Sequence, residues 1–342
     1  MLILPAFLGS AALLSSSTSA GTITFTQDAP VIDQWVYPFA SSPGTGFTAS
    51  VFSSKLPEGF GTDFDNRDGQ ALVAFDLSDI FAPGSEPASY SIVSATLTMR
   101  TATADTFQYD PTSDSYTSWL QLDDPNYVAD ADPGRPVEVF GTKFRNGLTA
   151  ASYTEGIPYS FSGPFGQGIR NAYPFAFNAP TVGQDVSNNV SVGFDPEPFG
   201  VATIAGLAPG DTVPIDSDLE FALDVSDPDI AQYIATAIDG GRLFLSVASL
   251  FETEQQGAGT FPTFYTKENP FVTLGLQEAG RLTIVLAIGP AADLNGDGVV
   301  DGADLGALLS AWGPCNDPCP ADLNGDGMVD GADLGVLLSE WS

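Results

Sequence analysis

Much of the chain between Gly21 and Ile288 alternates between apolar and polar residues, which is the pattern of β-strands that bury one face. Clusters of Pro, Gly, Asn and Asp separate these runs, as expected of the turns that join strands. The predicted strands are Thr22–Thr26, Ala71–Phe75, Ser91–Arg100, Val137–Phe140, Val201–Ile204, Asp218–Val225, Arg242–Val247 and Arg281–Ile288. We therefore expect a mainly β large domain, a β-sandwich of the jelly-roll kind.

One segment of this region has a helical pattern instead. Ile230 and Ile234 recur at helical spacing, Asp227 is suited to cap a helix before them, and Pro228 fits the first turn. The pair Gly240-Gly241 follows and should end the helix. A single short helix among many strands does not change the expected fold class.

The C-terminal part of the chain is a repeat. Residues 292–312 read ADLNGDGVVDGADLGALLSAW and residues 321–341 read ADLNGDGMVDGADLGVLLSEW, 29 positions later, with differences at three of the 21 positions. Each copy has apolar residues at i, i+3, i+4 and i+7, namely Leu305, Leu308, Leu309 and Trp312, and Leu334, Leu337, Leu338 and Trp341. This spacing predicts one amphipathic helix per copy. Since neither helix can bury its apolar face alone, we expect the two faces to pack together.

These patterns divide the chain into four parts. Residues 1–20 contain an apolar run followed by small residues, which predicts a secretory signal peptide. The β-sandwich module covers 21–288, a short linker 289–291, and a small α-helical domain 292–342. No later stretch approaches the roughly 18 apolar residues that a membrane-spanning helix needs. We expect a secreted, extracellular protein that does not insert into a membrane. Attachment to the cell surface is compatible with this location.

Charge and residue usage exclude several function classes. With 43 acidic and 10 basic residues the formal charge is −33, which repels phosphate backbones and argues against a nucleic-acid partner. The chain has no histidine and two cysteines, which excludes Ser-His-Asp and Cys-His catalysis and the usual zinc sites. Hydrolysis by two carboxylates is the main enzymatic route left. The candidates are too many to single out a pair: Asp63, Asp65, Asp68, Glu155, Glu252 and Glu254 are among them.

Each copy of the repeat contains a calcium-binding loop of the EF-hand type. Such a 12-residue loop places oxygen ligands at positions 1, 3, 5, 7, 9 and 12, with glycine at position 6. The first loop offers Asp293, Asn295, Asp297, the carbonyl of Val299, Asp301 and Asp304; the second offers Asp322, Asn324, Asp326, the carbonyl of Met328, Asp330 and Asp333. Position 12 is Asp instead of the usual Glu. The alternative interpretation is an array of Asp-Gly turns on a solvated acidic tail.

We expect each loop to bind one Ca²⁺, so the predicted cofactor is calcium at two sites. Ca²⁺ accepts six to eight oxygen ligands in flexible geometry, whereas Mg²⁺ demands a near-ideal octahedron. No predicted helix precedes either loop, so each copy is half of an EF-hand. Each loop holds four carboxylates whose repulsion opposes folding, and we therefore expect calcium binding and folding of the tail to be coupled.

The duplicated loop-and-helix unit of residues 292–342 resembles the type I dockerin family. The resemblance implies calcium-dependent docking to cohesin receptors, commonly in extracellular assemblies that degrade polysaccharides. In the family, two pairs of positions in each copy contact cohesin, and both depart from its pattern here. Loop positions 10 and 11 are Gly302-Ala303 and Gly331-Ala332, and the later pair is Leu309-Ser310 and Leu338-Ser339. The implied partner is therefore a cohesin-like or other extracellular receptor protein.

Cys315 and Cys319 lie between the two copies, four positions apart. In an exported protein this spacing favours an intrachain disulfide that constrains the linker. Two free thiols are the alternative.

The large module resembles the DNRLRE-type jelly-roll modules of secreted bacterial proteins, on the residues Asn66–Gln70, the strand that follows them, and the strand Ser91–Met99. That resemblance implies a jelly-roll fold, and some members of the family bind carbohydrate. Among many aromatic residues, most of which we expect in the core, Trp119 and the Tyr173–Phe177 cluster are the first candidates for stacking on sugar. Asp65 and Asp68 form a turn or a third cation site.

The leading hypothesis is a non-catalytic interaction protein, with polysaccharide as a second candidate ligand. The alternatives are a carboxylate-based polysaccharide hydrolase or lyase, and a structural surface-layer component.

Overall fold

The computed structural model describes residues 21–40, 44–55, 59, 61–81, 90–104, 107–253, 261–315 and 319–342. The predicted signal peptide and the candidate carboxylate Glu254 lie outside the described residues. The chain divides into two compact units, one formed by Thr24–Pro83 and Ile92–Val285, the other by Leu286–Ser342 with short pieces of two strands. The fold is mainly β, as predicted, with several antiparallel sheets.

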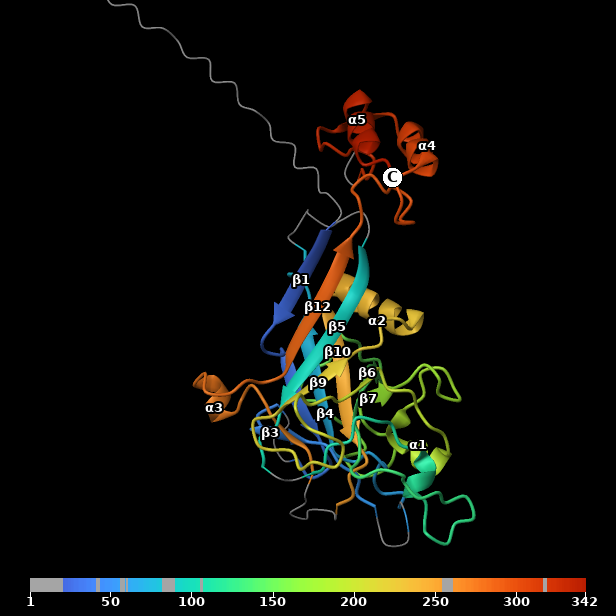
Figure 1. The fold of residues 1–342 in the computed structure, drawn as a ribbon. Helices are drawn as coiled ribbons and strands as arrows, with labels where there is room; N and C mark the ends of the chain where they lie inside the picture. The colour runs from blue at the N-terminus through green and yellow to red at the C-terminus, as the bar shows by residue number, and fades with distance from the viewer. Residues whose placement is uncertain are drawn as a thin grey trace, which may run out of the picture. The chain divides into compact units, whose positions relative to one another are not determined.

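The first large sheet has four strands in the order β1–β12–β5–β9 (Figure 1). Their bounds are Gly21–Gln27 for β1, Arg281–Ile288 for β12, Tyr90–Arg100 for β5 and Asp218–Ala222 for β9. Every second side chain of β12 is buried: Leu282, Ile284 and Leu286 are each 0 % exposed, and the residues between them are partly exposed. One face of this sheet therefore covers a core and the other meets solvent.

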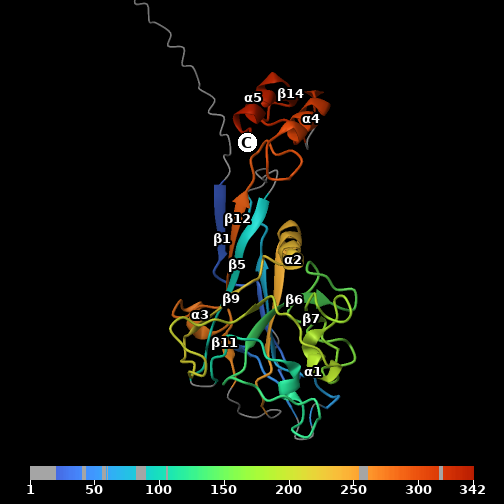
Figure 2. The ribbon, with the colours of Figure 1, turned by 45° about the vertical axis from the view of Figure 1, so that its right-hand side comes forward.

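The second large sheet has the order β2–β4–β10–β6–β7, and β8 pairs with β6. Figure 2 labels its strands β6 and β7. The bounds are Ile32–Val36 for β2, Gln70–Asp76 for β4, Arg242–Ser249 for β10, Val137–Phe144 for β6, Ala172–Phe175 for β7 and Gly200–Val201 for β8. The central strands β4 and β10 run antiparallel, with Val73 opposite Leu245. Nearly all of their residues are buried, so both faces of this sheet are covered. Tyr153 and Phe244 belong to the apolar cluster on one of these faces.

The remaining elements of the large unit are short. Strand β3 (Thr48–Ser50) pairs with β11 (Thr263–Tyr265), and the small helices are η1 (Tyr116–Trp119), η2 (Val186–Asn188), α1 (Asn189–Val192) and α3 (Pro270–Thr273). The described residues contain no helix that is long and apolar enough to cross a bilayer.

The helix predicted after Asp227 is confirmed as α2 (Pro228–Asp239). The Asp227 carboxylate accepts a hydrogen bond of 2.8 Å from the backbone NH of Asp229, which satisfies a donor that the first turn leaves open. Gly240 caps the end, and Gly241 follows with φ 75°, a conformation that favours glycine.

Seven of the eight predicted strands are confirmed, as β1, β4, β5, β6, β9, β10 and β12. The prediction of a strand at Val201–Ile204 was wrong in its extent, because β8 ends at Val201, Thr203 pairs with Glu220 only in an isolated bridge, and a turn follows. Strands β2 and β7 were missed. Their sequences do not alternate, and β7 contains Pro174, which cannot donate to a strand ladder.

Candidate calcium sites

The C-terminal repeat forms two helices of nine residues, α4 (Gly302–Ser310) and α5 (Gly331–Ser339). Each begins directly after the ninth loop residue, which caps it. The Asp301 carboxylate accepts from the Ala303 NH at 2.7 Å, while Asp304 Oδ2 accepts from the Asp301 NH at 2.8 Å. This reciprocal capping box satisfies NH groups that a helix start leaves open. The aspartates at positions 9 and 12 thus set where the helix begins.

The first aspartate of each loop organises the turn. Asp293 Oδ1 accepts from the NH groups of Gly296 and Asp297 at 2.9 and 3.1 Å, and Oδ2 accepts from the Gly298 NH at 2.8 Å. Gly298 has φ 87°, in the left-handed region where a side chain is strained. Glycine at position 6 therefore lets the backbone wrap around the carboxylate of position 1.

The second loop repeats this arrangement. Asp322 accepts from Gly325, Asp326 and Gly327 at 2.9, 3.1 and 2.7 Å, and Gly327 again has φ 87°. The residues at positions 3, 5 and 9 also each accept from the NH two residues further on, in both copies. Two segments of nearly the same sequence therefore fold their backbones in the same way.

The position-12 aspartates are fully buried, although both are shorter than the usual Glu. Asp304 Oδ1 accepts from the NH groups of Leu294 and Asn295 at 2.9 and 3.2 Å. Burial acts to raise the pKa of Asp304, but the backbone donors of Asp301, Asn295 and Leu294 together lower it. The carboxyl group is therefore held in its charged form, the form that ligates a metal ion.

The donor set of the loops fits a hard cation. Every candidate ligand offers oxygen, each loop has four carboxylates, and residues 292–342 contain no basic side chain. In the arrangement described, these carboxylates accept backbone hydrogen bonds. Within the described ranges, the groups of three or more acidic side chains with oxygens within 4.8 Å of one another lie elsewhere in the chain.

The two copies share one small core. It consists of the same positions from each copy, namely Ala292 and Ala321, Val300 and Val329, and Leu308 and Leu337. The copies also exchange backbone contacts: β13 (Gly313–Pro314), after α4, pairs with β14 (Met328–Val329) of the second loop, and the Ser342 NH donates to the Val300 carbonyl of the first loop at 3.1 Å. The segment that follows the helix of each copy therefore forms backbone hydrogen bonds with the loop of the other copy.

The predicted packing of the whole apolar stripe was wrong in part. Leu308 and Leu337 are buried, but Trp312 and Trp341 are 49 % and 45 % exposed, and Leu309 and Leu338 are exposed as well. A core built from two short helices and two loops has room for one leucine of each helix at its centre, and the later positions of the stripe lie on the flank.

Cys315 and Cys319 are joined in a disulfide, and both pack at the edge of this core. The residues between them lie outside the described part of the chain.

Asp65 and Asp68, for which the sequence left a turn or a cation site open, are not in the acidic groups that could hold a metal ion within the described residues. Both are buried beside Arg170, whose Nε lies 2.7 Å from Asp65 Oδ2 and whose Nη2 lies 3.5 Å from Asp68 Oδ1. Next to them, Arg67 and Glu138 form a second buried ion pair of 2.6 Å. The positive charges beside the acidic residues of this segment are those of Arg67 and Arg170.

Of the other candidate carboxylates, Glu155 and Glu252 are each paired with a lysine. Glu155 lies in a group with Asp33 and Glu268, and the Lys267 ammonium contacts all three. Burial raises the pKa of Asp33 to about 7, against the lowering effect of Lys267. Glu252 pairs with Lys55 at 3.2 Å, and Asp63 is exposed.

The aromatic candidates are mostly core residues. Trp119 is 2 % exposed, with its ring 4.3 Å from the Arg135 guanidinium carbon, so the proposal that it stacks on sugar was wrong. Phe175 is buried, and Phe177 stacks on Phe199. Of the Tyr173–Phe177 cluster, Tyr173 lines a mainly apolar cavity of about 480 Å³ between α2 and the second sheet.

A scan against protein-family models finds no match for this chain, and a search of curated proteins also finds none.

Sequence reasoning missed one group. Asp110, Asp114, Asp130 and Asp132 converge in the large unit, although their spacing along the chain matches no loop motif. The pairs Asp110/Asp114 and Asp130/Asp132, each in a Pro-containing loop, were the one available signal.

Proposed function

We propose that residues 292–342 are a dockerin-like calcium module that docks a β-rich cargo onto an extracellular receptor protein. The observation that carries this proposal is the duplicated loop, in which both copies have the same residue at each of the five side-chain ligand positions, and the first aspartate accepts the same backbone hydrogen bonds in both. A turn array without a metal has no need of this agreement at every ligand position.

The ligands would be the residues named from the sequence. The first loop would use Asp293, Asn295, Asp297, the Val299 carbonyl, Asp301 and Asp304, and the second Asp322, Asn324, Asp326, the Met328 carbonyl, Asp330 and Asp333. Bound calcium would supply charge neutralisation, which removes the repulsion among four carboxylates in each loop. Asp304 and Asp333 belong both to the ligand set and to the capping boxes of α4 and α5, so metal binding and helix position are linked.

The exposed apolar residues of the tail support a protein partner. Leu309 and Trp312 of the first copy and Leu338 and Trp341 of the second are exposed, on a segment that carries no basic side chain. Exposed tryptophan and leucine are typical of surfaces that become buried on binding a protein. We propose that the partner is a cohesin-like or other extracellular receptor protein. It would bind these four residues, because Gly302-Ala303 and Gly331-Ala332 depart from the pair that contacts cohesin in the family.

We propose that the cargo is a β-sandwich of the jelly-roll kind, secreted under the direction of residues 1–20. The burial pattern supports this fold: the β1–β12–β5–β9 sheet has one buried face, while both faces of the β4–β10 centre are covered. Packing the first sheet on one face of the second satisfies both patterns.

A pull-down from the secreted fraction of the source, with the full chain as bait, tests the function. We expect a captured protein in the presence of Ca²⁺, its loss in EDTA, and its loss when Asp293→Ala and Asp322→Ala are combined. A matched control combines Asp28→Ala and Asp79→Ala, which remove two exposed carboxylates outside the loops and should leave capture unchanged. Capture that is equal with and without Ca²⁺, and equal for the loop variant, would contradict the proposal.

A further inference from the structure

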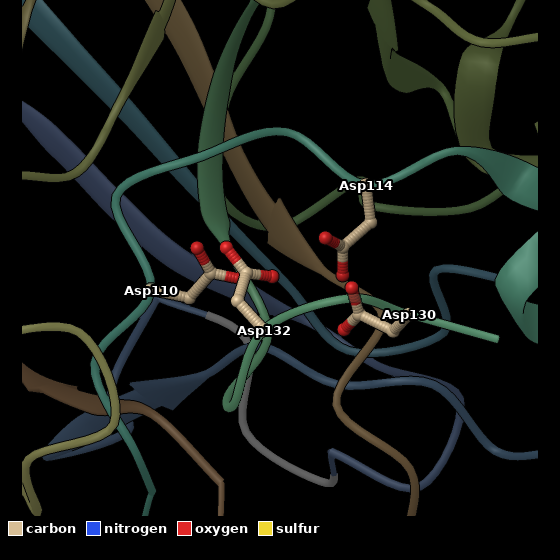
Figure 3. Close-up of side chains that lie close together, drawn as sticks. All are labelled: Asp110, Asp114, Asp130 and Asp132. Carbon is tan, nitrogen blue, oxygen red and sulfur yellow. The ribbon is translucent and has the colours of Figure 1, made fainter.

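Four aspartates of the large unit converge from two loops. Asp110 and Asp114 precede η1, Asp130 and Asp132 precede β6, and each offers an oxygen within 4.8 Å of the others (Figure 3). Asp110 is buried, Asp114 and Asp130 are partly buried, and Asp132 is exposed. The group therefore extends from the protein interior to solvent, which leaves a path by which an ion can enter.

The basic side chain bonded to this group neutralises one side of it. Arg135 Nη1 lies 3.0 Å from Asp114 Oδ2 and 2.7 Å from Asp130 Oδ2. One guanidinium facing four carboxylates leaves an excess of three negative charges when all four are ionised. On the other side, the Thr112 hydroxyl lies 2.7 Å from Asp110 Oδ1 and 3.2 Å from Asp132 Oδ2. Since a hydroxyl has a single hydrogen, it can donate fully to only one of these two oxygens.

Among the described residues, one oxygen of the group has no hydrogen-bond donor. Asp110 is 2 % exposed, and its Oδ2 is buried without a partner, while its Oδ1 accepts from the Thr112 NH and hydroxyl. A buried carboxylate oxygen that lacks a partner costs free energy, and such atoms are rare in folded proteins. In Figure 3 the Asp110 carboxylate lies beside that of Asp132, so the unsatisfied oxygen is on a side chain that belongs to the acidic group.

The loops approach closely because of one glycine. Gly134 has φ 105°, and a Cβ there would lie 3.0 Å from both Asp110 Cβ and the Gln108 carbonyl oxygen. A larger residue would push the loop of Asp130 and Asp132 away from Asp110. The backbone is thus built to bring together carboxylates that repel one another.

We propose that Asp110, Asp114, Asp130 and Asp132 form a third divalent-cation site, which binds Ca²⁺ and holds the two loops together. The donors are all oxygen, which selects a hard cation, and their irregular, partly solvated arrangement suits the flexible coordination of Ca²⁺ better than the octahedron of Mg²⁺. A cation here partners the unsatisfied Asp110 oxygen and offsets the charge that Arg135 leaves. The site lies outside the C-terminal repeat and does not depend on the function proposed for it.

The test uses the full chain with both C-terminal loops disabled by Asp293→Ala and Asp322→Ala. After EDTA treatment, isothermal titration with CaCl₂ alone should show one bound Ca²⁺ per chain. Adding Asp110→Asn and Asp132→Asn to this background should abolish the binding, and adding Asp28→Asn and Asp79→Asn should not. Asp132→Asn alone, which changes an exposed residue, should weaken binding at least tenfold with an unchanged far-UV circular dichroism spectrum.

The loop-disabled chain binding no Ca²⁺, or binding it equally after Asp110→Asn and Asp132→Asn, would overturn this proposal. Failure of the C-terminal sites gives a different result, because the unmodified chain and the loop-disabled chain would then bind the same number of ions.

Discussion

Arg170 is a fully buried charged residue of the large unit, and its contacts explain why it can be there. Its guanidinium donates to Asp65 Oδ2 and to the carbonyls of Val36 and Asp68 at 2.7, 2.7 and 2.5 Å. A buried charge is tolerated when it is paired and hydrogen-bonded in this way. The segment of Asp65 and Asp68, which the sequence predicted as a turn or a cation site, is therefore tied to the interior of the fold.

Replacing Arg170 should destabilise the protein strongly. We expect Arg170→Met to lower the free energy of unfolding by about 3–5 kcal/mol, because it leaves Asp65 buried without its partner. Urea unfolding followed by tryptophan fluorescence measures this. Arg281→Met removes a partly exposed arginine that pairs with Glu278, and should cost about 1 kcal/mol or less. Equal costs for the two variants would contradict the role assigned to Arg170.

Asp33 should make stability fall as the pH rises. Burial raises its pKa from 3.8 to about 7, so between these values the folded chain retains a proton that the unfolded chain has released. Its contribution to stability is therefore complete below pH 3.8 and lost as the pH approaches 7. We expect Asp33→Asn to remove this loss, so that the stability of the variant relative to the original protein increases from pH 5 to pH 7 in urea unfolding. The exposed control Asp28→Asn should show no such trend, and a flat difference for Asp33→Asn would contradict the assignment.

At the scale of elements, the C-terminal helices depend on each other and on the loops. Both helices are only nine residues long, too short to be stable alone in water, so tertiary contacts must hold them. Those contacts are the paired core positions of the two copies and the crossed backbone bonds at Val300 and Val329. Loss of one copy should therefore unfold the other.

The core leucines provide a test of this symmetry. We expect Leu308→Ala and Leu337→Ala each to destabilise the C-terminal unit by about 2–5 kcal/mol, and by similar amounts, because they occupy equivalent places in one core. The exposed neighbours Leu309→Ala and Leu338→Ala should change it by about 0.5 kcal/mol or less. Fluorescence of Trp312 and Trp341 during unfolding, in a chain whose other two tryptophans are replaced by Phe, reports on this unit. A large cost for one core leucine and none for the other would show that the copies fold separately.

What could be predicted from the sequence was local. Alternation identified seven strands, and capping residues identified α2, since both signals lie within a few consecutive residues. The two candidate calcium loops could be proposed because all their candidate ligands fall within 12 consecutive positions. In contrast, β2 contains Asp33 and Gln34, which are buried because Lys267 and Tyr153 bond to them from far along the chain. Nothing near β2 in the sequence reveals those partners.

The same reason explains what was missed at the candidate sites. Asp114 and Asp130 are 16 positions apart, and their convergence depends on the path of the loop between η1 and β6. The exposure of Trp312 and Trp341 was also missed, because the helical stripe does not show how small the core is. Spacing along the chain predicts candidate ligands within one loop. Which residues of different loops converge, and which apolar residues stay exposed, depends on the tertiary structure.

At the scale of the whole molecule, the formal charge of −33 is the dominant property, and divalent cations are its natural counterions. We propose that two of them bind at the C-terminal repeat and one in the large unit. In both places, carboxylates are brought together by backbone turns that need glycine, at Gly298, Gly327 and Gly134. Calcium should therefore raise the stability of each unit through its own sites, by mass action.

The central claim is that the two C-terminal loops each bind one Ca²⁺, and the most direct measurement is the number of ions bound by the full chain before and after these loops are disabled. Equilibrium dialysis of EDTA-treated protein against CaCl₂, with bound calcium measured by mass spectrometry, gives this number. The account predicts that combining Asp293→Ala with Asp322→Ala lowers it by two per chain, while Asp28→Ala with Asp79→Ala leaves it unchanged. Equal numbers for the original chain and the loop variant would contradict the account.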